Sequence, residues 1–172
     1  MRHAQSAGQA PDADLTVLGH QQAQNLIPIL TVLKIDALFT SPYLRASATI
    51  APYAGATDLG ITTLPDLHER VLAKHSLTDW QTHIAQSFDD FNYSCPGGES
   101  MKTTCDRAIK ALTIIANSNA TFPAAVSHGN LIAATLNRID RSFGFEKWQS
   151  MGNPELFKLT LVAGLPSSFE IL

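Results

Sequence analysis

The chain has 172 residues, with 12 basic and 15 acidic side chains and a formal net charge of −3. This length fits one domain, and a composition of 45% apolar and 16% charged residues supplies a sizeable core. A general nucleic-acid surface needs a basic excess, so no nucleic-acid partner is expected. A local basic pocket stays open, because net charge does not say where the arginines lie.

Cysteine usage and hydropathy bear on the compartment. Cys95 and Cys105 do not form a CxxC pair, and no secretory signal precedes them. We expect free thiols in a reducing, cytoplasmic setting, with a disulfide between the two as the minor alternative. No apolar run reaches the roughly 20 residues that cross a bilayer, so no membrane partner is expected.

The first third of the chain changes from polar loop to regular structure. Thr16 is a candidate N-cap for a helix whose apolar residues recur as far as Leu33. Pro28 lies inside this helix and is expected to kink or split it. The segments that follow are a buried strand, a helix and a β-branched strand, over residues 36–41, 44–53 and 61–64.

A segment without strand signal follows, over residues 71–95, and we predict a small lid insertion there. Its aromatic residues either pack the lid onto the body or contact a substrate, and packing is favoured because aromatic rings carry large burial energies. These residues are Trp80, Phe88, Phe91 and Tyr93. The last predicted elements are a helix from 101 to about 117, a strand over 122–127, a helix over 129–139, and strands over 155–162 and 169–172.

Strands that alternate with helices indicate an α/β fold, a three-layer α/β/α sandwich with a mainly parallel central sheet, as a single domain over residues 1–172. Such a sheet usually begins with a hydrophobic strand that feeds the first loop. Here Arg2-His3 follows Met1 directly, so we expect the usual first strand to be lacking, through a truncated or mis-assigned start or a real loss. Its loss would expose sheet edges and loosen His3, and a homodimer stays open as the oligomeric form.

Polar side chains follow the candidate strands closely. Ligands of open α/β sheets bind at the carboxyl ends of the strands, so these side chains are expected to share one rim. Arg2 and His3 would join them if a strand preceded them. The residues at the rim are Ser41 and Arg45, Glu69 and Arg70, and His128 and Gly129.

Phosphoryl transfer needs these residue types. A neutral imidazole attacks phosphorus and forms a phospho-enzyme, and guanidinium groups donate paired hydrogen bonds to phosphoryl oxygens. The leaving alkoxide needs a proton, for which Glu69 is the candidate donor. The helix that begins at Gly129 presents free N–H groups, which favour an anion.

At these positions the sequence resembles the histidine phosphatase superfamily, the phosphoglycerate-mutase-like clan. The resemblance is ordered along the chain and covers roughly Arg2 to Asn130. The family usually has Gly where this chain has Ala4. The motifs are Arg2-His3-Ala4-Gln5-Ser6, Leu15-Thr16 with Gly19 and Gln22-Ala23, Ser41-Pro42 with Arg45, Leu67-His68-Glu69-Arg70, Pro96-Gly97-Gly98-Glu99-Ser100 and Ser127-His128-Gly129.

The resemblance implies a phosphohistidine at His3 and a proton donor at Glu69, in a reaction without metal or cofactor. It implies a phosphate pocket made by Arg2, Arg45 and His128. Gln9 falls in the loop where the family often places an amide that faces the phosphate, and this is a weaker match. Two roles stay open for Arg70: it binds the substrate, or it pairs with an acidic residue on the surface.

We therefore expect a phosphomonoester hydrolase that acts through phosphohistidine on a small phosphorylated molecule. The short segment 71–95 favours a phosphatase over a mutase of the phosphoglycerate-mutase type, which stays as an alternative. A non-catalytic phosphate-binding or interaction module, disabled by loss of the first strand, is the alternative from another class. His68, His75 and His83 fit no metal-ligand spacing, so no metal site is expected.

Overall fold

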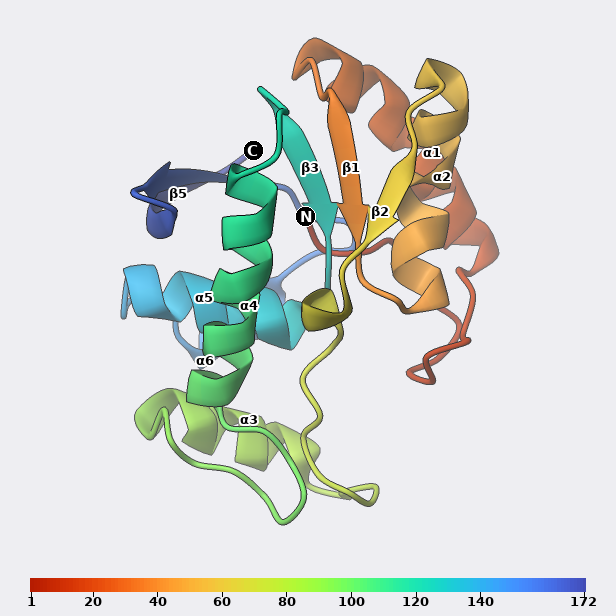
Figure 1. The fold of residues 1–172 in the computed structure, drawn as a ribbon. Coiled ribbons are helices and arrows are strands. Elements are labelled where there is room, and N and C mark those ends of the chain that lie inside the picture. Colours follow the sequence, from red (N-terminus) through yellow and green to blue (C-terminus); the bar gives the residue numbers. More distant parts are fainter.

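The computed structural model describes the whole chain, residues 1–172, around a central parallel sheet (Figure 1). Three strands form this sheet in the order β2-β1-β3: β1 (Ala37–Thr40), β2 (Ile61–Thr63) and β3 (Pro123–Val126). Both neighbours run parallel to β1, and Leu38 of β1 stands opposite Ile61 and Ala124. The prediction of a mainly parallel central sheet is confirmed.

Helices cover both faces of the sheet and complete three layers (Figure 1). α1 (Val17–Val32) and α2 (Leu44–Thr57) pack on one face, where Ile50 lies in a core cluster with Leu38 and Val126. α4 (Met101–Ala116) covers the other face, where Ala111 packs against Phe39. α5 (Gly129–Ile139) runs beside α4, and the short 3-10 helix Pro65–Leu67 follows β2.

The two long helices begin at side-chain caps. Thr16 Oγ1 accepts the Gly19 N–H at 3.0 Å, and Ser100 Oγ accepts the Thr103 N–H at 3.1 Å. α1 continues through Pro28 as one helix, so the split that was predicted as one of two outcomes does not occur. Pro28 and Gln24 lie on its exposed side, so water can satisfy the carbonyl that the missing N–H leaves free.

As predicted, the usual first strand is lacking, and only one parallel bridge between Arg2 and Ser127 stands in its place. On one side, His3 N–H donates to the Ser127 carbonyl at 3.0 Å, and on the other Arg2 N–H donates to the Glu155 carbonyl at 2.8 Å. The expectation that His3 would be loosened is therefore wrong, because main-chain hydrogen bonds hold these residues on both sides.

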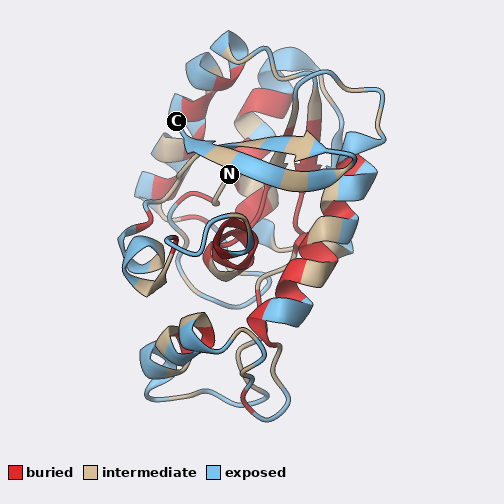
Figure 2. Cartoon of the chain, turned by 90° about the vertical axis from the view of Figure 1, so that its left-hand side faces the viewer, coloured by how far each residue is buried: buried red, intermediate tan, exposed pale blue.

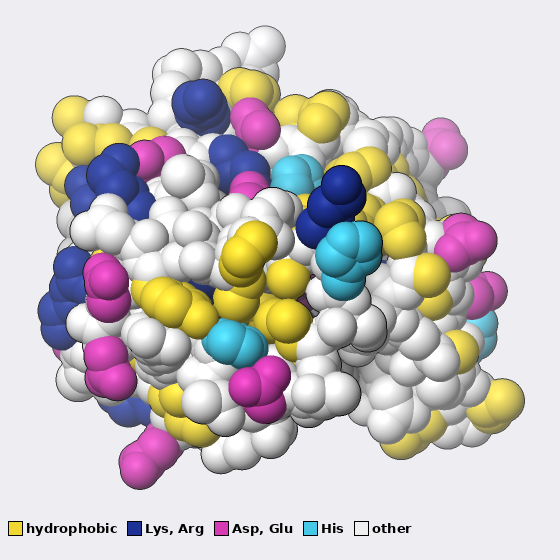
Figure 3. All heavy atoms as spheres, turned by 90° about the horizontal axis from the view of Figure 1, so that it is seen from below, with side chains coloured by type: hydrophobic (Ala, Val, Ile, Leu, Met, Phe, Trp, Pro, Cys, Tyr) yellow, Lys and Arg dark blue, Asp and Glu magenta, His cyan; other side chains and the backbone are white.

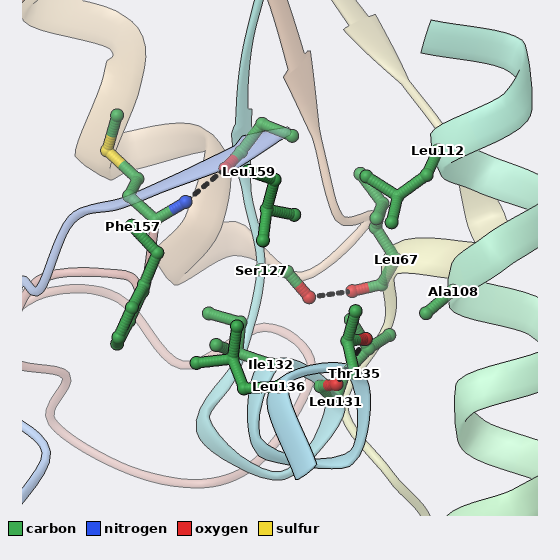
Figure 4. Close-up of a pocket in the computed structure, with 12 residues that line it drawn as sticks. Leu67, Ala108, Leu112, Ser127, Leu131, Ile132, Thr135, Leu136, Phe157 and Leu159 are labelled. Carbon is green, nitrogen blue, oxygen red and sulfur yellow. Dashed lines mark hydrogen bonds between the residues drawn. The ribbon is translucent and has the colours of Figure 1, made fainter. Parts of the chain in front are cut away.

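Beside Met1, an apolar cavity of about 580 Å³ separates β3 from β4 (Phe157–Val162). A smaller cavity of about 60 Å³ lies against α4 and α5, and Figure 4 shows the side chains that line it, with Leu67 and Leu112 on one side and Phe157 and Leu159 on the other. β4 does not pair with the central sheet.

The C-terminal strands form a separate hairpin. β4 pairs antiparallel with β5 (Leu165–Ile171), which is longer than the strand predicted over 169–172. The hairpin packs over α5 through Phe157 and Phe169, which both contact Phe143 edge to face. Figure 2 shows α5 largely buried, whereas the hairpin is mostly exposed or half-buried. A short helix that was not predicted, α6 (Phe145–Ser150), precedes the hairpin.

The segment predicted as a lid contains α3 (Trp80–Asp89) between two loops, at the end of the molecule below the sheet in Figure 1. Its aromatic residues mostly pack: Phe88 and Phe91 join an apolar cluster, and Tyr93 stacks on His83. Trp80 is the exception, with 44% of its surface exposed. Cys95 and Cys105 are both free thiols. None of the helices combines the length and apolar character that crossing a membrane requires.

Candidate active site

The carboxyl ends of β1 and β3 meet the segment Met1–His3 at the lower end of the sheet, facing α3 (Figure 1). Seen from this end, hydrophobic side chains and histidines gather around a hollow in the surface (Figure 3). Arg45 contacts His3 through a hydrogen bond of 3.2 Å, and the rings of His3 and His128 lie 5.1 Å apart. Residues from three distant parts of the chain therefore share one site.

His3 is buried, and its hydrogen bonds fix its tautomer. Nδ1 lies 2.7 Å from the Ala4 carbonyl, which can only accept, so Nδ1 carries the proton. Nε2 then holds the lone pair, and it accepts the Arg45 Nε–H at 3.2 Å. Asn153 Nδ2 donates to the His3 carbonyl at 2.7 Å and fixes the backbone at this residue. The free electron pair of His3 thus faces a guanidinium group.

The pKa of His3 is lowered to about 4, mainly by burial and to a smaller extent by the charges of Arg45 and Arg2, against a raising effect of the hydrogen bond to Ala4. We expect the ring to stay neutral down to about pH 4 rather than 6.5, the usual value for histidine. Folding then favours the neutral form, so stability should be lost as pH falls from 6.5 toward 4. NMR of the imidazole nitrogens during a pH titration measures this, and a His3 midpoint near 6.5 would contradict it.

Hydrogen-bond donors without protein partners surround His3. Arg45 is 1% exposed, and its Nη1 donates to the carbonyls of Gln9 and Ala10, which holds the group in place and leaves Nη2 unpaired. Arg2 Nη1 donates to the carbonyls of Met151 and Gly152, while its buried Nε has no partner. Buried unpaired donors are costly, so an anion that accepts from them would be bound favourably.

His128 adds a third donor. Its Nε2 lies 2.7 Å from Ser41 Oγ, and that oxygen already accepts the Tyr43 N–H. The Ser41 hydroxyl can donate to Nε2, and in that tautomer the His128 proton lies on Nδ1. Nδ1 is buried without a partner, and burial together with Arg45 lowers the pKa of His128 strongly. A neutral ring with an unpaired N–H can donate to an anion.

Glu69 is the carboxyl group of the site. Its Oε1 accepts the Arg70 N–H at 2.8 Å, and the charges of Arg45 and Arg2 act on it. Burial nevertheless raises the pKa of Glu69 above its usual value, because it outweighs these lowering effects. The carboxyl group therefore tends to hold its proton nearer to neutral pH, as a proton donor requires.

The loop that carries Glu69 is held from α4. Arg107 Nη1 donates to the carbonyls of Asp66 and His68, at 2.8 and 2.7 Å. Glu99 in turn binds Arg107 with both carboxylate oxygens, at 2.8 and 2.9 Å. The Gly97-Gly98-Glu99-Ser100 turn therefore does more than start a helix, because its Glu99 holds the arginine that fixes the loop.

Replacing Glu99 with alanine should lower the free energy of unfolding by about 2–4 kcal/mol, since Arg107 would keep a largely buried charge without its partner. Urea denaturation measures this. The matched control is Asp106→Ala, which removes the exposed ion pair with Lys102 and should cost less than about 1 kcal/mol. Equal effects of the two variants would contradict the positioning role.

Among the other predicted residues, Gly129 lies at the site, where a β-carbon would stand 3.4 Å from Arg2 Nε. Gln9 contributes its main-chain carbonyl to Arg45, but its exposed side chain makes no hydrogen bond. The Arg70 guanidinium donates to the Glu99 carbonyl and to Ser87 Oγ, which lies on α3. This arrangement favours a structural role for Arg70 over substrate binding.

Three residues near the site were not predicted. Tyr43 packs edge to face on His128, with ring centroids 5.0 Å apart, and Arg45 lies over its ring. Asn153 and Trp148 come from the C-terminal part of the chain, after the last motif. An aromatic residue after a strand, or a lone Asn in a loop, gives no signal in the sequence. No group of three or more His, Cys, Asp or Glu side chains is arranged to hold a metal ion.

A parallel α/β sandwich with a buried histidine among unpaired guanidinium donors has the features expected of a phosphoryl-transfer protein. The chain matches the profile of the histidine phosphatase superfamily (branch 1) over residues 1–168. It therefore belongs to this superfamily. The search of curated proteins found no match.

Solved structures with the same fold include phosphatases. A mycobacterial glucosyl-3-phosphoglycerate phosphatase in complex with inorganic phosphate is 25% identical, with a TM-score of 0.73 over 92% of this chain and 86% of that one. A putative α-ribazole-5'-P phosphatase from Escherichia coli is 17% identical, with a TM-score of 0.75 over 100% and 93%. YhfR from Bacillus stearothermophilus is 21% identical, with a TM-score of 0.73 over 99% and 92%.

Proposed function

We propose that this protein is a phosphomonoester hydrolase that acts through a phosphohistidine at His3, without metal, on a small phosphorylated molecule. The observation that carries this proposal is the hydrogen bond from Arg45 Nε–H to His3 Nε2, because it gives a neutral nucleophile next to a phosphate-binding group. The phosphatases among the structural relatives support the same reaction class.

In the first step, the lone pair of His3 Nε2 attacks phosphorus, and the ester P–O bond breaks. The leaving oxygen takes the proton of Glu69, and Arg2, Arg45 and His128 stabilise the charge on the phosphoryl oxygens. Nδ1–H of His3, held by the Ala4 carbonyl, keeps the ring oriented and stabilises the positive charge that develops on it. This step yields an alcohol and a phosphoryl group on His3.

In the second step, Glu69 acts as a base. Its carboxylate takes a proton from a water molecule, the water oxygen attacks phosphorus, and the N–P bond to His3 breaks. The products are inorganic phosphate, a neutral His3 and a protonated Glu69, so the site returns to its first state. A site dry enough to raise the pKa of Glu69 suits both steps.

Two observations bear on the alternatives. A mutase must bind a second acidic group, yet the neighbouring buried guanidinium groups of Arg70 and Arg107 are already held by Glu99, Ser87 and main-chain carbonyls. A non-catalytic binding module would have no need of a raised pKa at Glu69. Two buried free thiols fit our placement of the protein in the cytoplasm.

The test is release of inorganic phosphate from alkyl and aryl phosphates in excess chelator. The proposal expects turnover that the chelator leaves unchanged. Tight phosphate binding without turnover would support the binding module, and turnover that needs added metal would overturn the metal-free mechanism.

A further inference from the structure

Trp148 brings an aromatic surface to the phosphate site. A β-carbon on Gly129 would lie 3.5 Å from Arg2 Cζ and 3.6 Å from Trp148 Nε1, so the guanidinium and the indole flank the same point. The same helix end holds Arg2 through the Met151 carbonyl. The indole of Trp148 thus stands next to a group that would bind phosphate.

Trp80 extends this surface away from the phosphate. Its ring meets that of Trp148 edge to face, with centroids 6.1 Å apart, and Phe145 stacks behind Trp148 at 5.4 Å. Trp80 and Trp148 come from α3 and α6, which also contact each other through Phe88 and Phe145. We call Trp80 and Trp148 the tryptophan wall.

Packing within the protein leaves part of the tryptophan wall exposed. Trp80 keeps 44% of its surface exposed, although an indole that served only packing would be expected to lie deeper. A second aromatic pair, Tyr43 stacked on His68, lies on the side of His128. Figure 3 shows hydrophobic side chains and histidines around the hollow on this face, with a Lys or Arg side chain next to one of the histidines.

The arginines near the site restrict the chemistry of a substrate group that contacts the tryptophan wall. Arg70 donates to Glu99 and Ser87, and Arg107 is bound by Glu99, so neither is free for a second acidic group. Arg2 and Arg45 would be occupied by the phosphate. The part of the substrate beyond the phosphate therefore meets aromatic surface rather than free guanidinium groups.

We propose that the tryptophan wall binds the organic part of the substrate, and that this part is a planar or apolar ring one or two bonds beyond the ester oxygen. This inference rests on the proposed function for the site of the phosphate. Trp80 and Trp148 are then specificity residues that stack on the ring while the phosphate lies against His3.

The test uses two unreactive phosphonates, phenethyl phosphonate and ethyl phosphonate, so that binding is measured without turnover. The chain has two tryptophans, Trp80 and Trp148, so its indole fluorescence reports on the wall alone. Phenethyl phosphonate should change this emission and bind about five- to tenfold more tightly than ethyl phosphonate. Equal affinities with no change in emission would overturn the proposal.

Variants separate the wall from general apolar binding. Trp80→Ala should remove most of the preference for phenethyl phosphonate, and Trp80→Phe should restore part of it. Phe122→Ala removes an exposed aromatic side chain before β3 and should leave the preference intact. A preference that survives Trp80→Ala, or that is lost equally in Phe122→Ala, contradicts the assignment.

Turnover is measured separately with benzyl and methyl phosphate, the ester counterparts of the two phosphonates, whose leaving groups have similar basicity. Binding of phenethyl phosphonate with a change in emission, but no hydrolysis of either ester, would refute the proposed function and leave the wall as a binding site. Hydrolysis of both esters at equal kcat/KM would refute the wall and leave the phosphatase.

Discussion

Replacing His3 with alanine is expected to lower kcat/KM for phosphate esters by at least about three orders of magnitude. His3 presents an unprotonated Nε2 to Arg45, since its Nδ1–H is committed to the Ala4 carbonyl, whereas His128 Nε2 is bonded to Ser41 Oγ. Without the His3 imidazole no covalent intermediate forms, and the guanidinium donors alone cannot divide the reaction into two steps. Steady-state kinetics with an aryl phosphate measures the loss.

The matched control for His3 is His20→Ala, which removes an exposed histidine on α1. This variant should keep the parent kcat/KM. Thermal unfolding of both variants checks that each still folds. Inorganic phosphate should still bind to the His3→Ala variant through Arg45 and His128. Activity of His3→Ala within tenfold of the parent would rule out His3 as the nucleophile.

Glu69→Gln is the second change with a large expected effect, a loss of about 10²–10³-fold in kcat for alkyl phosphates. Glutamine keeps the shape and the hydrogen bond to Arg70 N–H but has no proton to give. Because burial raises the pKa of Glu69, the parent activity should be present below that pKa and fall as pH rises through it. The variant should lack this alkaline loss.

Leaving groups give the control for Glu69. Dinitrophenolate leaves without a proton, so Glu69→Gln should depress kcat/KM for dinitrophenyl phosphate far less than kcat/KM for ethyl phosphate, because this ratio does not include hydrolysis of the phosphohistidine. An equal loss for both esters would mean that Glu69 positions other groups and does not donate a proton.

Local signals in the sequence were sufficient for most of the fold. The predicted helix over 129–139 is the observed α5, because the motif before it marks its start and its apolar spacing marks its face. The strand over 36–41 was also found, as β1 over Ala37–Thr40. Helix α6 escaped prediction because six residues give too short a period to detect.

Long-range pairing could not be predicted from local signals. The hold on Arg2 and His3 comes from Ser127 and Glu155, more than 120 residues away, so a missing strand looked like a loosened site. The same applies to Asn153 and Trp148, which reach the site through the path of the C-terminal chain. For Arg70, sequence left two roles open, and the guanidinium bonds to Glu99 and Ser87 favour the structural one.

The central claim is a covalent phosphoryl group on His3, and trapping it is the most direct measurement. The protein would be mixed with dinitrophenyl phosphate, stopped with base within one turnover and analysed by mass spectrometry of its peptides. We predict one added phosphoryl group, located on His3, stable in base, lost in acid, and absent from His3→Ala. A phosphoryl group on another residue, or full turnover with none trapped even in Glu69→Gln, would contradict the account.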